Sequence, residues 1–326
     1  MTNHLNRRAM LALGTGALMM ASLPAMAQSG WPSGSVQLVV PARAGGGTAG
    51  AARIVAAALQ EQTGQPFVVV NNPGGGGVVA AETVRSADPD GQTLLFFHSG
   101  ILAMHHTGAI EAVPLEDFTT AAAMAVGGTY ALAVAADSPW QNVADLVAAA
   151  EADPNGVTLG VQIRGSTHFM AGLLMMDSGA EFRIVDAGSD ADKLVQLQGH
   201  QIDAAMINTA GTLQYVESGD LRILGTIAGE AGRDPAAPDT PSVAEQGYEN
   251  VLYGLDFLIM GPAGMDDATI DAINAAFTGV VSDPEVAAQF ETMRMPLTAI
   301  PAEETRARLE ATDARVAQTA ELLGLN

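Results

Sequence analysis

The chain has 326 residues, which is enough for one large domain or two medium ones, each with its own hydrophobic core. Its formal net charge of −22 excludes nucleic acid as a partner, and the absence of cysteine excludes disulfides, thiol nucleophiles and thiolate metal sites. Since 48% of the residues are hydrophobic and only 15% are charged, the body of the chain is expected to fold rather than stay disordered.

Residues 1–27 are predicted to be a signal peptide. Arg7 and Arg8 precede an apolar run at 9–23 that is too short to span a bilayer comfortably, and 25–27 read as a small-x-small cleavage site. The paired arginines leave both the Sec and the twin-arginine export routes open, and an uncleaved membrane anchor is a third alternative. Cleavage would remove two positive charges and no acid, so the net charge would change from −22 to −24 (−22 − 2 = −24).

Strands and helices are predicted to alternate along the rest of the chain, with a less regular stretch after the third strand. This β-α-β-α-β order favours a parallel sheet with crossover helices. The expected strands cover residues 36–40, 67–70, 93–97, 130–135, 157–161, 182–185, 204–207, 221–227 and 255–260. The expected helices cover residues 49–62, 79–86, 145–152, 167–176, 190–198, 211–217, 266–281, 284–294 and 301–323.

Two glycine-rich loops follow the first two predicted strands. The first reads Pro41-Ala-Arg-Ala-Gly-Gly-Gly-Thr48 and the second reads Asn71-Asn-Pro-Gly-Gly-Gly-Gly-Val78. Glycine runs at strand ends allow close backbone approach, and amides at the start of a helix attract anions. We therefore expect an anion site there, while a tight turn in which Thr48 caps the next helix is the alternative. The candidate residues are Gly46, Gly47, Thr48, Gly75, Gly76, Gly77 and Val78.

Small polar residues follow several of the other predicted strands. In open α/β sheets, ligands bind outside the carboxyl ends of the strands, so these residues are expected to face the same cleft. Ser166 or Thr167 could instead serve only as the cap of its helix. The candidate residues from these strand ends are Ser99, Ser166, Thr167, His168, Ser189 and Asn208.

The two glycine loops begin a series of motifs that resembles one protein family. The series continues through Pro89-Asp-Gly-x-Thr-Leu-Leu95, Gly165-Ser-Thr, Gly199-His-Gln-Ile-Asp203, Pro241-Ser-Val-Ala-Glu-Gln-Gly247 and Pro262-Ala-Gly264. In order and spacing the motifs resemble the substrate-binding proteins of tripartite tricarboxylate transporters, the Bug/TctC group of bacterial periplasmic receptors. The resemblance covers nearly all of the chain after the signal peptide.

The resemblance implies the α/β fold of a type II periplasmic binding protein. Two βα lobes would be joined by two hinge strands, with a ligand cleft between the lobes. Lobe 1 would contain residues 30–129 plus 255–326, and lobe 2 would contain residues 130–254. The chain would cross between the lobes near Tyr130 and near Leu255.

The resemblance also implies a function. The protein would be a periplasmic receptor that binds a small organic carboxylate and delivers it to the membrane components of a tripartite tricarboxylate transporter. A linear C4–C6 dicarboxylate, a tricarboxylate and an aromatic dicarboxylate all remain open. The resemblance further implies a monomer with no cofactor.

The chain departs from the family pattern at several cleft positions. Ala49 stands where the family often has an acid, which favours a plain carboxylate over an amine-bearing ligand. Arg43 stands where a small residue or proline is usual, so it could pair with a carboxylate or remain solvated. His168 and Phe169 replace the usual serine and histidine, and Asp186 replaces a usual tyrosine. His168 could be a pH-sensitive ligand contact or a buried, satisfied histidine.

Two other classes of function are less well supported by the residues. An enzyme is disfavoured because the chain has no cysteine, no Gly-x-Ser-x-Gly motif and no pair of acids in the loops. His98, His105 and His106 form the one histidine cluster, but their spacing is a weak metal signal and no metal is expected. A ligand sensor for a receptor kinase would share the same cleft, and a neighbouring kinase gene would favour it over transport.

Overall fold

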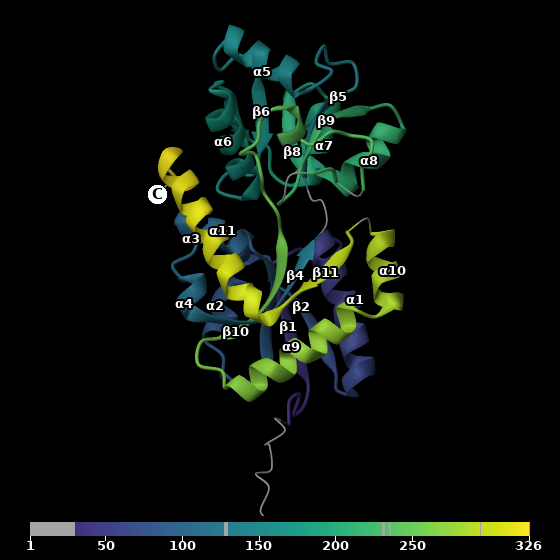
Figure 1. The fold of residues 1–326 in the computed structure, drawn as a ribbon, viewed down its shortest axis with the longest axis vertical. Helices are drawn as coiled ribbons and strands as arrows, with labels where there is room; N and C mark the ends of the chain where they lie inside the picture. Colours follow the sequence, from purple (N-terminus) through teal and green to yellow (C-terminus); the bar gives the residue numbers. More distant parts are fainter. Residues whose placement is uncertain (1–29, 127–129, 230–231, 235, 294, 326) are drawn as a thin grey trace, which may run out of the picture.

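The computed structural model describes residues 30–126, 130–229, 232–234, 236–293 and 295–325. The predicted signal peptide therefore lies outside the described residues, as do residues 127–129 of the crossing expected near Tyr130. Figure 1 shows two bodies, one above the other, each built on its own sheet. We call the body around the sheet β11-β4-β10-β3-β1-β2 lobe 1, and the body around the sheet β7-β6-β8-β5-β9 lobe 2. Within the described residues, no helix is long and apolar enough to cross a membrane.

The central part of the lobe 1 sheet is parallel, as the β-α-β-α-β order predicts. Strand β1 pairs in parallel with β2 on one side and with β3 on the other, whereas β10 runs antiparallel to both β3 and β4. The strands of this sheet are β1 (Val36–Val40), β2 (Phe67–Asn71), β3 (Thr93–His98), β4 (Phe118–Val126), β10 (Asp256–Pro262) and β11 (Leu297–Ile300). Its helices are α1 (Gly47–Thr63), α2 (Val78–Arg85), α3 (Gly100–His106), α4 (Pro114–Asp117), α9 (Asp267–Val281), α10 (Pro284–Thr292) and α11 (Ala302–Leu322).

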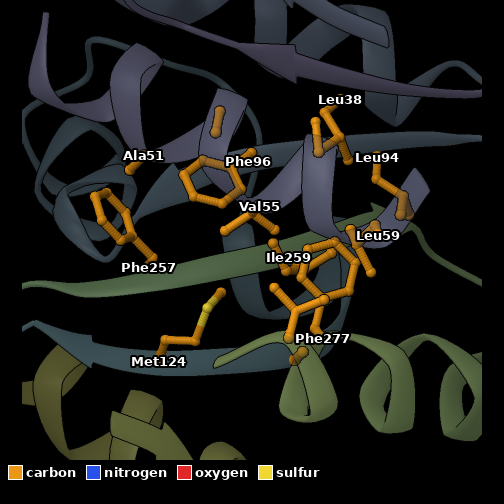
Figure 2. Close-up of a cluster of buried hydrophobic side chains, with 14 of the residues drawn as sticks. Leu38, Ala51, Val55, Leu59, Leu94, Phe96, Met124, Phe257, Ile259 and Phe277 are labelled. Carbon is orange, nitrogen blue, oxygen red and sulfur yellow. The ribbon is translucent and has the colours of Figure 1, made fainter. Parts of the chain in front are cut away.

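The core of lobe 1 lies between this sheet and the helices α1 and α9 (Figure 2). Ala51, Val55 and Leu59 recur at helical spacing on the buried face of α1, where they pack on the sheet. The rings of Phe96 and Phe257 lie 5.0 Å apart, which joins neighbouring strands β3 and β10. Because burial of each large side chain contributes about 1.5–3 kcal/mol, this cluster holds the loops at the strand ends on a rigid base.

Lobe 2 repeats the α/β pattern with a different strand order. Strand β6 is parallel to β7 and β8, while β5 runs antiparallel to β8 and β9. Its strands are β5 (Tyr130–Ala135), β6 (Thr158–Val161), β7 (Arg183–Asp186), β8 (Ala204–Asn208) and β9 (Leu221–Ile227). Its helices are α5 (Val143–Ala152), α6 (Ser166–Ser178), α7 (Asp190–Gln198) and α8 (Thr209–Glu217).

The lobes are connected near the end of β4 and the start of β10. Val126 N–H donates to the Leu255 carbonyl at 3.1 Å, so the two connecting segments lie side by side. Helix α11 links the lobes as well (Figure 1). Its Arg308 forms a bidentate pair with the buried Asp256 of β10, at 2.7 and 2.9 Å, and its Val316 packs in the hydrophobic core of lobe 2.

Two strands of lobe 1 were not predicted. Residues 118–126 were assigned to a less regular stretch, but they form β4, which lies inside the sheet between β10 and β11. This strand is rich in alanine, which has little intrinsic preference for strands, so burial between neighbours decides its conformation. Strand β11 lies between two predicted helices, and its short, partly exposed run gives little periodic signal.

Candidate ligand-binding cleft

A hollow of about 470 Å³ lies between the lobes, at the carboxyl ends of strands from both sheets. Lobe 1 lines it with the loops after β1, β2 and β3, and lobe 2 lines it with the segments after β6 and β7. The lining from lobe 1 includes Pro41, Ala42, Thr48, Gly75, Gly76, Phe97, His98, Gly100, Met104 and Ala109. The lining from lobe 2 includes Tyr130, Gln162, Ile163, Arg164, Gly165, Ser166, Thr167, Ser189, Asp190 and Lys193.

A second hollow of about 250 Å³ shares part of this lining. Its other walls include the apolar residues Val126, Leu255, Phe257 and Met295, together with Gly47 and Asn208. The residues that line both hollows are Thr48, His98, Tyr130 and Asp190. These four side chains therefore stand in the middle of the cleft, where the two hollows meet.

The first glycine loop contributes the start of α1. Gly46 takes an extended conformation (φ −75°, ψ 162°) as the N-cap, so the helix begins at Gly47, and Thr48 lies within its first turn. The alternative in which Thr48 caps the helix is therefore wrong, and Thr48 lines both hollows. Gly46 does not line either hollow, and its N–H donates to the Arg43 carbonyl at 3.2 Å. The amides of Gly47 and Thr48 belong to the first helical turn, which has no intrahelical acceptors for them.

The second glycine loop forms a 3-10 turn with a conformation that favours glycine. Gly75, Gly76 and Gly77 have φ values of 61°, 70° and 113°, which residues with a side chain rarely adopt. Gly75 and Gly76 line the larger hollow, whereas Gly77 and Val78 do not. A side chain at Gly77 would meet Pro41 at 3.0 Å, so this glycine lets the two loops approach each other. The N–H of Val78 donates to the carbonyl of Gly74.

The start of α6 brings hydroxyl groups to the lobe 2 side. Gly165 is the N-cap and makes no side-chain cap, so the capping alternative for Ser166 and Thr167 is wrong. Ser166 Oγ accepts a hydrogen bond from the Tyr253 hydroxyl at 3.0 Å, and Thr167 Oγ1 accepts one from the Gln162 N–H at 2.8 Å. Both residues line the larger hollow.

His168 lies outside both hollows. Its Nδ1 accepts a hydrogen bond from the Arg164 N–H at 3.2 Å, and burial lowers the pKa of His168 from its ordinary value. The side chain is half-buried beside the helix start. It therefore fixes the loop before α6, and the structure does not bring it together with the cleft residues.

Ser189 and Asn208 approach the cleft from two further helix starts. Ser189 caps α7 in a capping box with Asp192, and it lines the larger hollow. Asn208 caps α8 by accepting from the Gly211 N–H at 3.0 Å, and it lines the smaller hollow. The hydrogen bond from Ser189 lowers the pKa of Asp192, and the charge of Arg43 lowers it further. Arg43 is exposed and lines neither hollow, and its link to α7 in the opposite lobe is this effect of its charge on Asp192.

Ser99 points away from the cleft. Its side chain is buried, and its Oγ accepts a hydrogen bond from the Asp256 N–H at 3.2 Å. The residues on either side of it, His98 and Gly100, line the larger hollow instead. A Cβ atom at Gly100 would lie 2.5 Å from His98 Nδ1 and 2.9 Å from Ser166 Oγ, so only glycine fits between the lobes there.

Sequence reasoning did not single out His98, Tyr130, Asp190 and Lys193 as residues of the cleft lining. Burial lowers the pKa of His98 to about 4, so the ring is neutral at neutral pH. Burial, with the Asp190 charge as a second cause, raises the pKa of Tyr130, which therefore keeps its phenolic proton. One signal was present: Lys193, the only lysine of the chain, follows Asp190 by three residues in a predicted helix.

The other two histidines of the cluster lie apart from the cleft. His106 Nε2 lies 2.7 Å from Asp313 Oδ1, which joins α3 to α11. Among the residues with described positions, no group of three His, Asp or Glu side chains is arranged to hold a metal ion.

Comparison with known proteins assigns the chain to a family. The family model described as tripartite tricarboxylate transporter family receptor (TctC) matches residues 51–323. A Cupriavidus necator protein described as "UPF0065 protein in gbd 5'region" is 31% identical over 283 residues, which cover 86% of this chain and 85% of that protein.

Solved structures share the fold along nearly the whole chain. R. palustris Rpa4515, solved with adipate, is 28% identical with a TM-score of 0.77, over 89% of this chain and 98% of that one. The periplasmic binding protein BugD is 23% identical with a TM-score of 0.74, over 90% of this chain and 98% of that one. The two-lobed fold expected from the sequence is thus confirmed. The chain belongs to the tripartite tricarboxylate transporter receptor family, TctC, whose members are solute-binding proteins.

Proposed function

We propose that this chain is a periplasmic receptor that binds a small organic carboxylate between its lobes and delivers it to the membrane components of a tripartite tricarboxylate transporter. The observation that carries the proposal is the hollow of about 470 Å³, which has glycine loops on one side and hydroxyl groups on the other. Its volume is in the range of small-molecule sites. The first turn of α1 at Gly47 and Thr48 would attract one carboxylate of the ligand.

A relative supports the choice of a carboxylate. Rpa4515, which is 28% identical to this chain, was solved with adipate, a linear dicarboxylate. Linear C4–C6 dicarboxylates, tricarboxylates and aromatic dicarboxylates are the classes to compare. Binding and release require no covalent step, so no enzymatic activity is proposed. Export would use residues 1–27 as a Sec or twin-arginine signal, and the receptor would act as a monomer.

Closure of the cleft would move two parts of the chain relative to each other. We propose that one part contains residues 30–129 plus 255–326 and the other residues 130–254, a division supported by sheet membership. Helix α11 would travel with lobe 1, because Arg308 pairs with the buried Asp256 of β10. Its far end packs on α6, where Gly172 leaves room for Leu323, so this contact would slide during closure.

The proposal is tested by thermal unfolding of the purified protein, refolded from denaturant to remove any bound solute. The panel contains mono-, di-, tri- and aromatic carboxylic acids. A ligand at 100 times its dissociation constant adds about 2.7 kcal/mol to the free energy of unfolding, which raises Tm measurably.

A raised Tm with one class of carboxylate supports the proposal and identifies that class. If no carboxylate raises Tm, while uncharged or purely cationic solutes do, the proposed function is contradicted. Transport is tested separately, by uptake of the identified acid in cells with and without the gene for this chain. Uptake that does not depend on the gene contradicts the delivery step.

A further inference from the structure

An acidic side chain stands in the middle of the proposed anion-binding cleft. Asp190 begins α7, its side chain is 42% exposed, and it lines both hollows. A free carboxylate at this place would repel the ligand that we propose. The hydrogen bonds around Asp190 show how its charge is neutralised and which acceptor capacity it keeps for a ligand.

Lys193 neutralises Asp190 from below the cleft surface. The lysine side chain is 1% exposed, and its Nζ donates to Asp190 Oδ1 at 3.1 Å, to the Met206 carbonyl at 3.0 Å and to Thr167 Oγ1 at 3.4 Å. An ammonium group has three N–H donors, so the protein itself uses all of them. Lys193 therefore holds Asp190 in place and has no donor left for a ligand.

The other oxygen of Asp190 is also fixed. Asp190 Oδ2 accepts a hydrogen bond from the Asn208 backbone N–H at 3.2 Å. Since each carboxylate oxygen can accept more than one hydrogen bond, the exposed face of this neutralised carboxylate keeps acceptor capacity towards the hollows. The pair thus presents an acceptor of fixed orientation without a net charge.

The neighbours of Asp190 in the middle of the cleft are donors. His98 Nδ1 accepts from the Gly100 N–H at 3.1 Å, so the neutral ring carries its proton on Nε2, for which the described residues offer no acceptor. Tyr130, whose raised pKa keeps the phenol protonated, lines the same two hollows. One fixed acceptor therefore lines the same two hollows as two side chains that can donate.

We propose that Asp190, held by Lys193, is a specificity-determining residue that selects carboxylate ligands bearing a hydroxyl group. The hydroxyl donates to the Asp190 carboxylate and accepts from His98 Nε2–H or the Tyr130 hydroxyl. This inference rests on the proposed function, since it concerns the same cleft. A ligand with a methylene group at this place would bury the His98 N–H without an acceptor and leave the remaining acceptor capacity of Asp190 unused, which is unfavourable. An ammonium group can only donate, so it would leave the His98 N–H unpaired.

Isothermal titration calorimetry with pairs of acids that differ by one hydroxyl group tests the inference. The pairs are succinate and malate, glutarate and 2-hydroxyglutarate, and propionate and lactate, with aspartate and glutamate as the ammonium-bearing acids. For at least one pair, the hydroxy acid is expected to bind roughly tenfold to 100-fold more tightly than its partner, because hydrogen bonds to charged groups are the stronger ones.

Variants show whether Asp190 is the cause. Asp190→Asn with Lys193→Met removes both charges and keeps the net charge, and it is expected to reduce the preference for the hydroxy acid to roughly threefold or less. Asp190→Asn alone, which keeps an oxygen for Lys193, is also expected to reduce the preference for the hydroxy acid. Asp145→Asn makes the same change at the first turn of α5, outside both hollows, and is expected to leave the preference unchanged. Tm of each variant reports whether it folds.

Three results overturn the inference while leaving the proposed function intact. They are equal binding of both members of every pair, a preference that persists in folded Asp190→Asn protein, and tighter binding of the ammonium-bearing acids than of the hydroxy acids. Failure of every carboxylate to bind the unmodified protein contradicts the proposed function itself, and the inference falls with it.

Discussion

The two walls of the cleft are built from different parts of the polypeptide. The lobe 1 wall combines loops rich in glycine, alanine and proline with Thr48, Phe97 and Met104, and His98 is its one ionisable side chain among the described lining residues. The lobe 2 wall is lined mostly by residues with polar side chains, including Arg164, Ser166, Asp190 and Lys193. Backbone amides offer the same contact whatever residue carries them, whereas side chains change with each substitution. Lobe 1 is therefore suited to a feature that many ligands share, and lobe 2 to features that distinguish them.

The largest expected effect comes from adding a charged side chain to the lobe 1 wall. Gly76→Asp places a carboxylate in the larger hollow, since a Cβ at this position meets no other atom within 4 Å. Like-charge contact costs several kcal/mol, so affinity for any carboxylate is expected to fall by roughly 100-fold or more in calorimetric titrations.

The matched control is Gly45→Asp, which also has a positive φ and open space but lines neither hollow. It should carry a similar backbone strain and retain affinity within roughly threefold. Equal loss of affinity in both variants would show that the net charge of the loop, rather than its contact with the ligand, controls binding.

The second prediction concerns His98, the ionisable side chain of the lobe 1 wall. Because burial lowers the pKa of His98 to about 4 from 6.5, the unfolded chain binds a proton that the folded chain does not bind between these values. The free energy of unfolding is therefore expected to fall as the pH drops from about 6.5 to about 4, with up to about 3 kcal/mol from this residue.

Urea unfolding of His98→Asn at several pH values measures this contribution, since the asparagine oxygen can still accept from the Gly100 N–H. The pH dependence should become shallower in this variant. His200→Asn, at an exposed histidine with φ of 51°, should keep the dependence of the unmodified protein. Identical pH profiles for all three proteins would argue against a buried, neutral His98.

The smallest expected effect tests whether the lobe 2 wall is ordered in the absence of ligand. Ser166 Oγ accepts from the Tyr253 hydroxyl, and burial raises the pKa of Tyr253 to about 12, so this phenol stays protonated. Ser166→Ala and Tyr253→Phe are each expected to lower the free energy of unfolding by about 1 kcal/mol. The double variant should cost less than the sum, because both changes remove the same bond. Additive losses in urea unfolding would mean that the hydrogen bond is not formed.

Much of the fold could be predicted because its elements have strong local signals. Strands such as β1 and β2 are runs of valine between turn residues, and Gly64 ends α1 in the left-handed conformation (φ 71°) that the sequence suggests. Strand β4 lacked such a signal, because alanine becomes a strand residue only through its neighbours in the sheet. Helix starts were misplaced where a glycine took the N-cap position, as at Gly46 and Gly165.

Part of each wall was predictable: the larger hollow is lined by the candidates Gly75 and Gly76 of lobe 1 and by Ser166, Thr167 and Ser189 of lobe 2. Glycine runs at strand ends indicate the loops of the lobe 1 wall, since a run of glycines usually marks close backbone approach or a positive φ. His98, Tyr130 and Asp190 come from three strands or helices in two lobes, and only the folded arrangement brings them into one cleft. Ser99 illustrates the converse error, because the strand end was identified correctly but the side chain points to the Asp256 backbone.

The burial of Lys193 has a consequence for the chemistry of the whole surface. Because the chain has no other lysine and this side chain is 1% exposed, the folded protein offers amine-directed reagents no accessible ε-amino group among its side chains. Acylating dyes and crosslinkers would react at the N-terminal amine of the native receptor, which gives a single labelling position. Reaction at Lys193 would then report that lobe 2 has opened or unfolded, because only such a change exposes this amine to the reagent.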